Sequence, residues 1–145
     1  MPDFQEIDGK DGVVIVATLN DTAAQTAANY GTIFTALKRG YEVLVVGEIH
    51  GTLPEGAKDP ESVTLQLEKL TGTTAKGSGT NILVTAFNLK STINTLVRKE
   101  GSDLTNKTLA VGDRLAWKTS GTLTALKDVH ITIYLKPLGK GDYRF

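Results

Sequence analysis

Apolar and polar residues alternate along several stretches of this chain, a period of two that is typical of a β-strand with one buried face. Residues 63–68 read VTLQLE and residues 129–136 read VHITIYLK, so each stretch gathers its apolar side chains on one face. In residues 114–118, RLAWK, the same alternation predicts that Leu115 and Trp117 face the interior. We therefore expect a half-buried strand at each of these three places.

A fourth alternating stretch covers residues 42–50 and divides its side chains into two sets. The apolar set consists of Val43, Val45 and Ile49. The polar set consists of Glu42, Glu48 and His50. The pattern predicts that the polar set faces solvent or a partner.

Further strands are predicted where β-branched residues lie between glycine-rich turns, at residues 13–19, 31–37, 81–87 and 109–116. Residues 13–19 and 81–87 are apolar on both faces, which indicates central strands covered on both sides, or a subunit interface. About eight short strands at fairly regular spacing predict an all-β fold, a jelly roll or β-sandwich with at most one or two short helices.

Two segments do not follow the strand pattern. Residues 88–97 have apolar residues at helical spacing after a capping Asn88, yet their Ser, Thr and Ile lower helix propensity, so a short helix and an irregular strand both stay open. Residues 21–28 could form one or two helical turns after Asp21, or a loop of small residues. The two segments account for the helices that the fold prediction allows.

The ends of the chain differ from its middle. We expect a single domain over residues 13–136, with an N-terminal arm at 1–12 and a C-terminal arm at 137–145, both polar and glycine-containing. Such ends are either frayed termini or extended segments that grip a neighbouring subunit. In the second case the partner-binding residues are Phe4, Tyr143, Arg144 and Phe145.

Composition removes several functional classes. Sixteen basic residues balance sixteen acidic ones, whereas a nucleic-acid-binding protein normally has a basic excess. There is no cysteine for a disulfide, a thiolate metal site or a nucleophile. No apolar run approaches the roughly 18 residues of a membrane span, and the first six residues, MPDFQE, do not resemble a signal peptide. We expect synthesis in the cytoplasm and no membrane or nucleic-acid partner.

The candidate chemical motifs are weak. His50 and His130 lie on the polar sides of their predicted strands, and no sequence motif supplies a nucleophile for either. Residues 8–12, DGKDG, lack the ligand spacing of a calcium-binding EF-hand. Residues 77–80, GSGT, lack the Lys-Ser/Thr of a P-loop and are expected to form a hairpin loop. The sequence therefore predicts no catalytic residue, no metal ligand and no cofactor.

A family resemblance gives a more specific hypothesis. Residues 30–138 resemble bacteriophage capsid decoration (cement) and head-fibre proteins, more clearly in the second half. The similarity rests on residues 62–73, 79–83, 87–90, 109–116, 121–126 and 129–135. It implies a jelly-roll domain, often homotrimeric, that binds major capsid protein on the outside of the virion and performs no catalysis. Residues 1–29 show no clear match.

Three classes of function are left open by the sequence. The cement protein requires extended contact surfaces and no pocket. A carbohydrate- or receptor-binding module on the same fold requires exposed aromatic residues on one sheet face, where Trp117 is expected to be in the core. An enzyme would need an Asp and Ser motif set in glycine-rich loops, and we find none. A cement trimer and the base of a fibre are not separated by the sequence.

Overall fold

The computed structural model describes residues 12–19, 30–55 and 62–139, and these residues form strands joined by turns and loops. Within them, one 3₁₀ turn, η1, covers Gly101–Asp103. The strands are β1 (Val13–Leu19), β2 (Tyr30–Thr35), β3 (Gly40–His50), β4 (Thr64–Leu70), β5 (Thr80–Asn81), β6 (Phe87–Asn88), β7 (Val97–Glu100), β8 (Thr108–Leu109), β9 (Arg114–Ser120) and β10 (Val129–Leu138).

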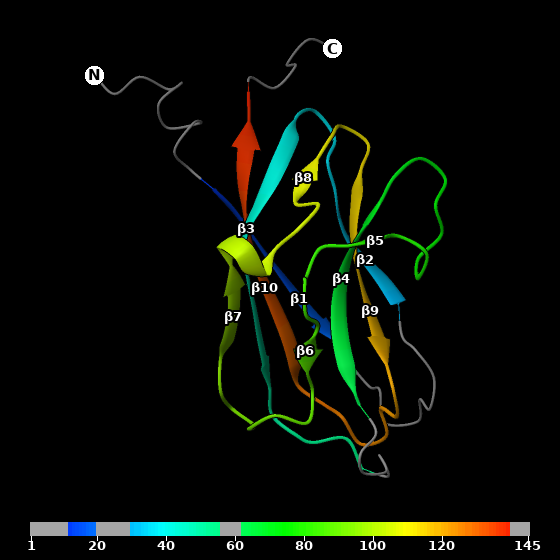
Figure 1. Cartoon of the computed structure of the whole chain (residues 1–145), viewed down its shortest axis with the longest axis vertical. Helices are drawn as coiled ribbons and strands as arrows, with labels where there is room; N and C mark the ends of the chain where they lie inside the picture. The colour runs from blue at the N-terminus through cyan, green and yellow to red at the C-terminus, as the bar shows by residue number, and fades with distance from the viewer. Residues whose placement is uncertain (1–11, 20–29, 56–61, 140–145) are drawn as a thin grey trace, which may run out of the picture.

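The strands form two antiparallel sheets that pack face to face as a β-sandwich (Figure 1). The first sheet has the order β1-β10-β3-β7, with β8 also pairing with β3. The second has the order β2-β9-β4-β5, with β6 also pairing with β4. The predicted all-β sandwich or jelly-roll class is confirmed, although β5, β6 and β8 are only two residues long.

The core lies between the two sheets and follows the alternation of the sequence. In β10 the alternate apolar residues from Val129 to Leu135 are at most 2% exposed, whereas the polar residues and the tyrosine between them are exposed, as predicted. Leu65 and Leu67 of β4 and Leu115 of β9 belong to the same core cluster and come from the second sheet. Burial of this apolar surface is the main favourable term in folding.

Two predicted strands are wrong, because residues outside any strand interrupt each of them. Residues 109–116 divide into β8, which belongs to the first sheet, and β9, which belongs to the second. Gly112 lies in the turn between them with φ +92°, a left-handed conformation that glycine adopts readily. Residues 81–87 contain the end of β5, an isolated bridge from Leu83 to Leu104 and the start of β6.

The open choice for residues 88–97 is decided against a helix. Asn88 ends β6, and its side-chain Oδ1 accepts a hydrogen bond from the backbone N–H of Lys90 over 2.9 Å, which forms a turn. Asn94 has φ +54°, and its N–H donates to the carbonyl of His50 over 2.7 Å. Val97 then begins β7. The segment is thus a loop that is tied to the end of β3.

The arms at 1–12 and 137–145 stay a prediction. β1 begins at Val13, next to the predicted boundary, and β10 continues through Leu138, slightly beyond the other predicted boundary. Residues 21–28 and the DGKDG stretch, except for Gly12, lie outside the described residues.

Candidate functional site

The predicted partner-binding residues Phe4, Tyr143, Arg144 and Phe145 all lie outside the described residues, so their role stays a prediction. The described part of the chain offers three other places of interest. These are the outer face of the first sheet, a buried Glu–His pair in β3 and a polar hollow on the second sheet.

The outer face of the first sheet, called the outer face below, has apolar residues at its centre. The strand registers arrange its side chains in rows that cross β1, β10, β3 and β7 in that order. One row contains Val14, Tyr134, Val45 and Glu100, and the next contains Val16, Thr132, Gly47 and Arg98. Val14 and Val16 are 59% and 60% exposed. Exposed apolar side chains gathered in one place often mark a contact surface.

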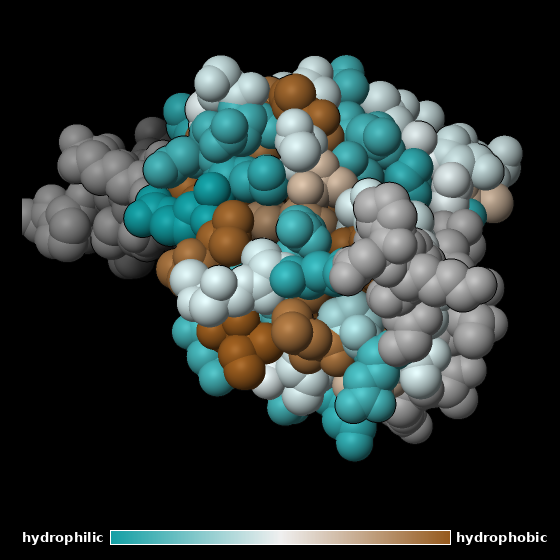
Figure 2. Space-filling view, turned by 60° about the horizontal axis from the view of Figure 1, so that its bottom comes forward, coloured by the Kyte–Doolittle hydropathy of each residue, from teal (hydrophilic) through white to brown (hydrophobic). Residues whose placement is uncertain are grey.

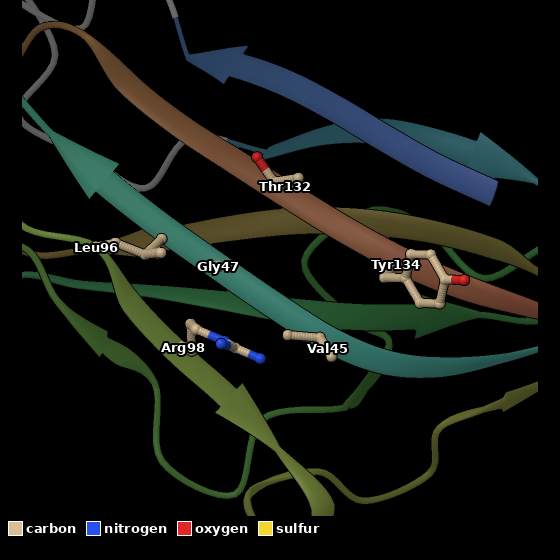
Figure 3. A pocket seen from close by; sticks show the side chains of 6 residues that line it. All are labelled: Val45, Gly47, Leu96, Arg98, Thr132 and Tyr134. Atoms are coloured by element: carbon tan, nitrogen blue, oxygen red, sulfur yellow. The ribbon is translucent and has the colours of Figure 1, made fainter. Parts of the chain in front are cut away.

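A shallow hollow of about 330 Å³ lies in the middle of the outer face (Figure 3). It exists because Gly47 has no side chain, so the sheet surface dips between its neighbours. A Cβ placed on Gly47 would lie 3.2 Å from Cδ1 of Leu96, which covers one side of the dip. The residues that line the hollow are Val45, Gly47, Leu96, Arg98, Thr132 and Tyr134.

The charges on this face lie at two margins, Arg98 and Glu100 on β7, and Lys136 opposite Glu42 near one end of β10 and β3. The Nη2 atom of Arg98 is 3.3 Å from Oε2 of Glu100, and both side chains are more than half exposed. An exposed pair of this kind contributes little to stability, about 0–1 kcal/mol. The face therefore has an apolar centre and charged margins, and such an arrangement suits contact with a protein surface.

β3 itself departs from the predicted division of its side chains. The register with β10 shifts between Tyr134 and Leu135, so that Leu44 is an extra residue in a β-bulge. A one-residue shift moves every following side chain to the opposite face. Glu48 and His50, which follow the bulge, therefore point into the core and are at most 1% exposed. The expectation that they face solvent or a partner is wrong.

The buried Glu48 and His50 side chains bind each other. Nδ1 of His50 lies 3.0 Å from both carboxyl oxygens of Glu48, and Nε2 lies 3.0 Å from the backbone carbonyl of Ser91. A carbonyl only accepts hydrogen bonds, so Nε2 carries a hydrogen. Nδ1 facing a carboxyl group then requires a second proton, which the two side chains share. Burial raises the pKa of the Glu48 carboxyl above its ordinary 4.5, although the hydrogen bond and charge of His50 act to lower it.

This pair predicts a stability that depends on pH. Above about pH 6.5, where a free histidine is neutral and a free carboxyl group is ionised, the folded pair keeps a proton that both side chains lack after unfolding, so unfolding releases a proton and rising pH favours it. We expect the free energy of unfolding, measured in urea, to fall by up to about 1.4 kcal/mol per pH unit until the folded carboxyl titrates. In Glu48→Gln this part of the slope should be absent. An equal dependence of the free energy of unfolding on pH in both proteins would contradict the conclusion that Glu48 and His50 retain this proton.

Glu48, His50 and Ser91 are linked in the same order as the acid, histidine and serine of a catalytic triad, but their hydrogen bonds differ from those of a triad. The imidazole Nε2 hydrogen bonds to the main-chain carbonyl of Ser91 rather than to its hydroxyl, and it donates rather than accepts. A general base must be able to take the proton of the nucleophile. The His50 side chain is also fully buried, so we assign the pair a structural role.

The outer side of the second sheet has a polar hollow of about 370 Å³. Its lining includes Lys118 and the pair Thr64 and Ser120, whose hydroxyl oxygens are 2.6 Å apart. Lys118 Nζ lies 3.5 Å from a carboxyl oxygen of Glu68, which is fully buried. The sequence pattern separated the polar side of β4 from its apolar side, but it did not show that a loop covers Glu68.

That loop contains the glycine-rich residues 77–80, which connect β4 to β5 as the predicted hairpin loop. The N–H groups of Gly77 and Gly79 donate to the two Glu68 oxygens over 2.6 and 3.3 Å. The loop therefore binds the chain's own carboxylate. This contact anchors it on the sheet.

Apolar surface also occurs in separate patches. Figure 2 turns the lower end of the molecule forward and shows several brown patches between polar residues. Among the described residues, no group of three or more His, Cys, Asp or Glu is placed to hold a metal ion. The same ranges contain no helix that is long and apolar enough to cross a membrane.

Comparisons with known proteins show little. No family model matches the chain, and no curated protein matches it. Solved structures of infectious bursal disease virus, strains Gx and Gt, are each 14% identical to it, with TM-scores of 0.33 and 0.23. Each match covers 92% of this chain and 38% of the viral chain, so this chain spans well under half of that length. Similarity at this level carries no argument about function.

Proposed function

We propose that this chain is a non-enzymatic structural protein of a bacteriophage virion. It binds the outer surface of the capsid and stabilises neighbouring major capsid subunits, as a homotrimer. It would be synthesised in the cytoplasm of the bacterial host and then reside on the capsid surface. The proposal requires no cofactor, membrane or nucleic acid.

The exposed apolar outer face is the observation that supports a binding function. Val14, Val16 and Tyr134 present apolar surface on the sheet, and the hollow at Gly47 gives that surface a shape to which a partner can be complementary. A trimer would present three such faces at once. Modest affinity of each face then gives strong attachment through effective concentration.

The carbohydrate- or receptor-binding alternative receives less support. Trp117 is partly buried and packs against the core, so its ring does not offer the stacking platform that a sugar site requires. The polar hollow beside Lys118 remains the place where such a ligand would bind. If the tests below contradict the capsid proposal, glycan binding to this hollow is the alternative that they favour.

The first test is quantitative mass spectrometry of virus particles purified from the source culture. We expect this chain at a copy number comparable with that of the major capsid protein. A few copies per particle would indicate a tail or fibre component. Absence from the particles would contradict the proposal and favour the glycan-binding alternative.

A pair of variants tests the contact surface. Tyr134→Asp adds a charge to the outer face, and Ser120→Asp adds the same charge to an exposed position on the second sheet. We expect Tyr134→Asp to reduce the occupancy of the particles on the order of tenfold, because a desolvated, unpaired carboxylate is unfavourable in an interface. Ser120→Asp should bind as the unmodified protein does. Equal occupancy by both variants would exclude the outer face as the capsid contact.

A further inference from the structure

β1 forms one edge of the first sheet, and among the described residues it has none of the features that normally protect an edge. Its sequence, VVIVATL, contains no charge and no proline, and all seven residues pair with β10 without a bulge. Within the described part of the chain, no strand pairs with its other side. Exposed edges of this kind offer free backbone N–H and C=O groups to another strand.

The other sheet edges differ from β1. β7, at the opposite edge of the first sheet, carries three consecutive charged residues, Arg98, Lys99 and Glu100. β2 has an irregular register between Thr32 and Phe34, and β5, β6 and β8 are only two residues long. Charges, bulges and short length all disfavour pairing between molecules. The contrast singles out β1 among the described edges.

We infer that β1 pairs with β1 of a second copy of this chain, antiparallel and about a two-fold axis. The register that uses the whole strand and keeps inner and outer faces aligned is centred on Val16. It places Val16 opposite Val16 of the second copy and Val14 opposite Thr18. On the inner side it places Ile15 opposite Ala17.

The chain's own chemistry favours a second copy as the occupant. These residue pairs are apolar or Val–Thr, so the strand is complementary to itself without any charge to pair. The chain has zero net charge, so two copies do not repel each other strongly. The two-fold axis is perpendicular to the joined sheet, which makes both outer faces point to the same side. This contact is separate from the three-fold contact of a trimer, and it exists whether or not the chain binds a capsid.

The absence of cysteine from the sequence allows a sharp test in the full-length protein. In the proposed register the two copies of residue 16 have Cα atoms roughly 4.5–5.5 Å apart, within the range of a disulfide. The two copies of residue 14 are offset along the strands by about 13 Å. Val16→Cys and Val14→Cys are a matched pair, since the two valines are 60% and 59% exposed on the same face of one strand.

Under mild oxidation we expect Val16→Cys to form a disulfide-linked pair on the order of tenfold faster than Val14→Cys, because only the former brings its two thiols within bonding distance. A mixture of Val14→Cys and Thr18→Cys should cross-link as Val16→Cys does. Equal rates for Val16→Cys and Val14→Cys, or no cross-link in either, would overturn the inference.

A non-covalent measurement complements the cross-link. In sedimentation experiments we expect Val16→Lys to weaken self-association of the chain on the order of tenfold, because two lysines would face each other across the strand pair. Thr132→Lys is the matched control, since Thr132 is exposed and lies beside Val16 but one strand away from the edge. Equal self-association of both variants would also overturn the inference. Cross-linking without incorporation into virions would support the β1 pairing and contradict the proposed function. Incorporation into virions without cross-linking would contradict the β1 pairing and support the proposed function.

Discussion

We expect His50→Leu to reduce the free energy of unfolding by about 3–5 kcal/mol, because it leaves the buried Glu48 carboxyl group without its partner. The substitution also removes the donor to the Ser91 carbonyl. The loss should appear as a lower urea midpoint with an unchanged slope.

The double variant Glu48→Leu/His50→Leu should be more stable than His50→Leu alone. Removing both members of a buried pair leaves no uncompensated charge, so the two substitutions should be strongly non-additive. His130→Leu is the matched control, since His130 is exposed on the neighbouring strand and its expected change is within about 0.5 kcal/mol. Equal stability of the double variant and His50→Leu would show that Glu48 does not depend on His50.

The position of this pair illustrates a limit of sequence reasoning. Alternation predicted the faces of β10 correctly because the pattern continues from Val129 to Lys136 without an interruption. β3 has the same kind of alternation, but the bulge at Leu44 reverses it. Residues 43–46 are all apolar, so nothing in the local sequence shows which of them is the extra one. The buried Glu–His pair was therefore missed.

The position of a strand within its sheet, at the centre or at the edge, is a second property that local sequence does not show. β1 was predicted with its observed bounds, and its apolar character on both faces was correctly recognised. The interpretation as a central strand is wrong, because β1 has β10 on one side and lies at the end of the sheet that the described residues form. The other interpretation, a subunit interface, agrees with the exposure of Val14 and Val16 and is the basis of the proposed β1 pairing.

The candidate contact surface could not be predicted for a related reason. Its hollow combines Gly47 of β3 with Thr132 and Tyr134 of β10 and with Leu96, which lies just before β7. These residues are far apart in the sequence, and only the strand registers bring them together. The signal that was available is the small residue Gly47 within an apolar strand, since glycine in a strand often marks a close approach or a dip.

We expect Trp117→Ala to lower the free energy of unfolding by about 3–5 kcal/mol, which corresponds to a fall in melting temperature of roughly 10 °C or more. Trp117 is partly buried, packs against the core cluster and lies opposite Gly31 of β2 in the strand register. A Cβ on Gly31 would overlap the indole ring, so the ring lies directly over this glycine. Truncation would open a cavity between the two strands that the backbone cannot close easily.

Trp117→Phe is the control, because it keeps an aromatic ring over Gly31 and should lose less than half as much stability. Calorimetry on the three proteins provides the comparison. Trp117 is the single tryptophan of the chain, so its fluorescence in the unmodified protein reports the same unfolding transition independently. If Trp117→Ala melted at the temperature of the unmodified protein, the ring would not belong to the core. It would then be free to serve as the stacking surface that the carbohydrate-binding alternative requires.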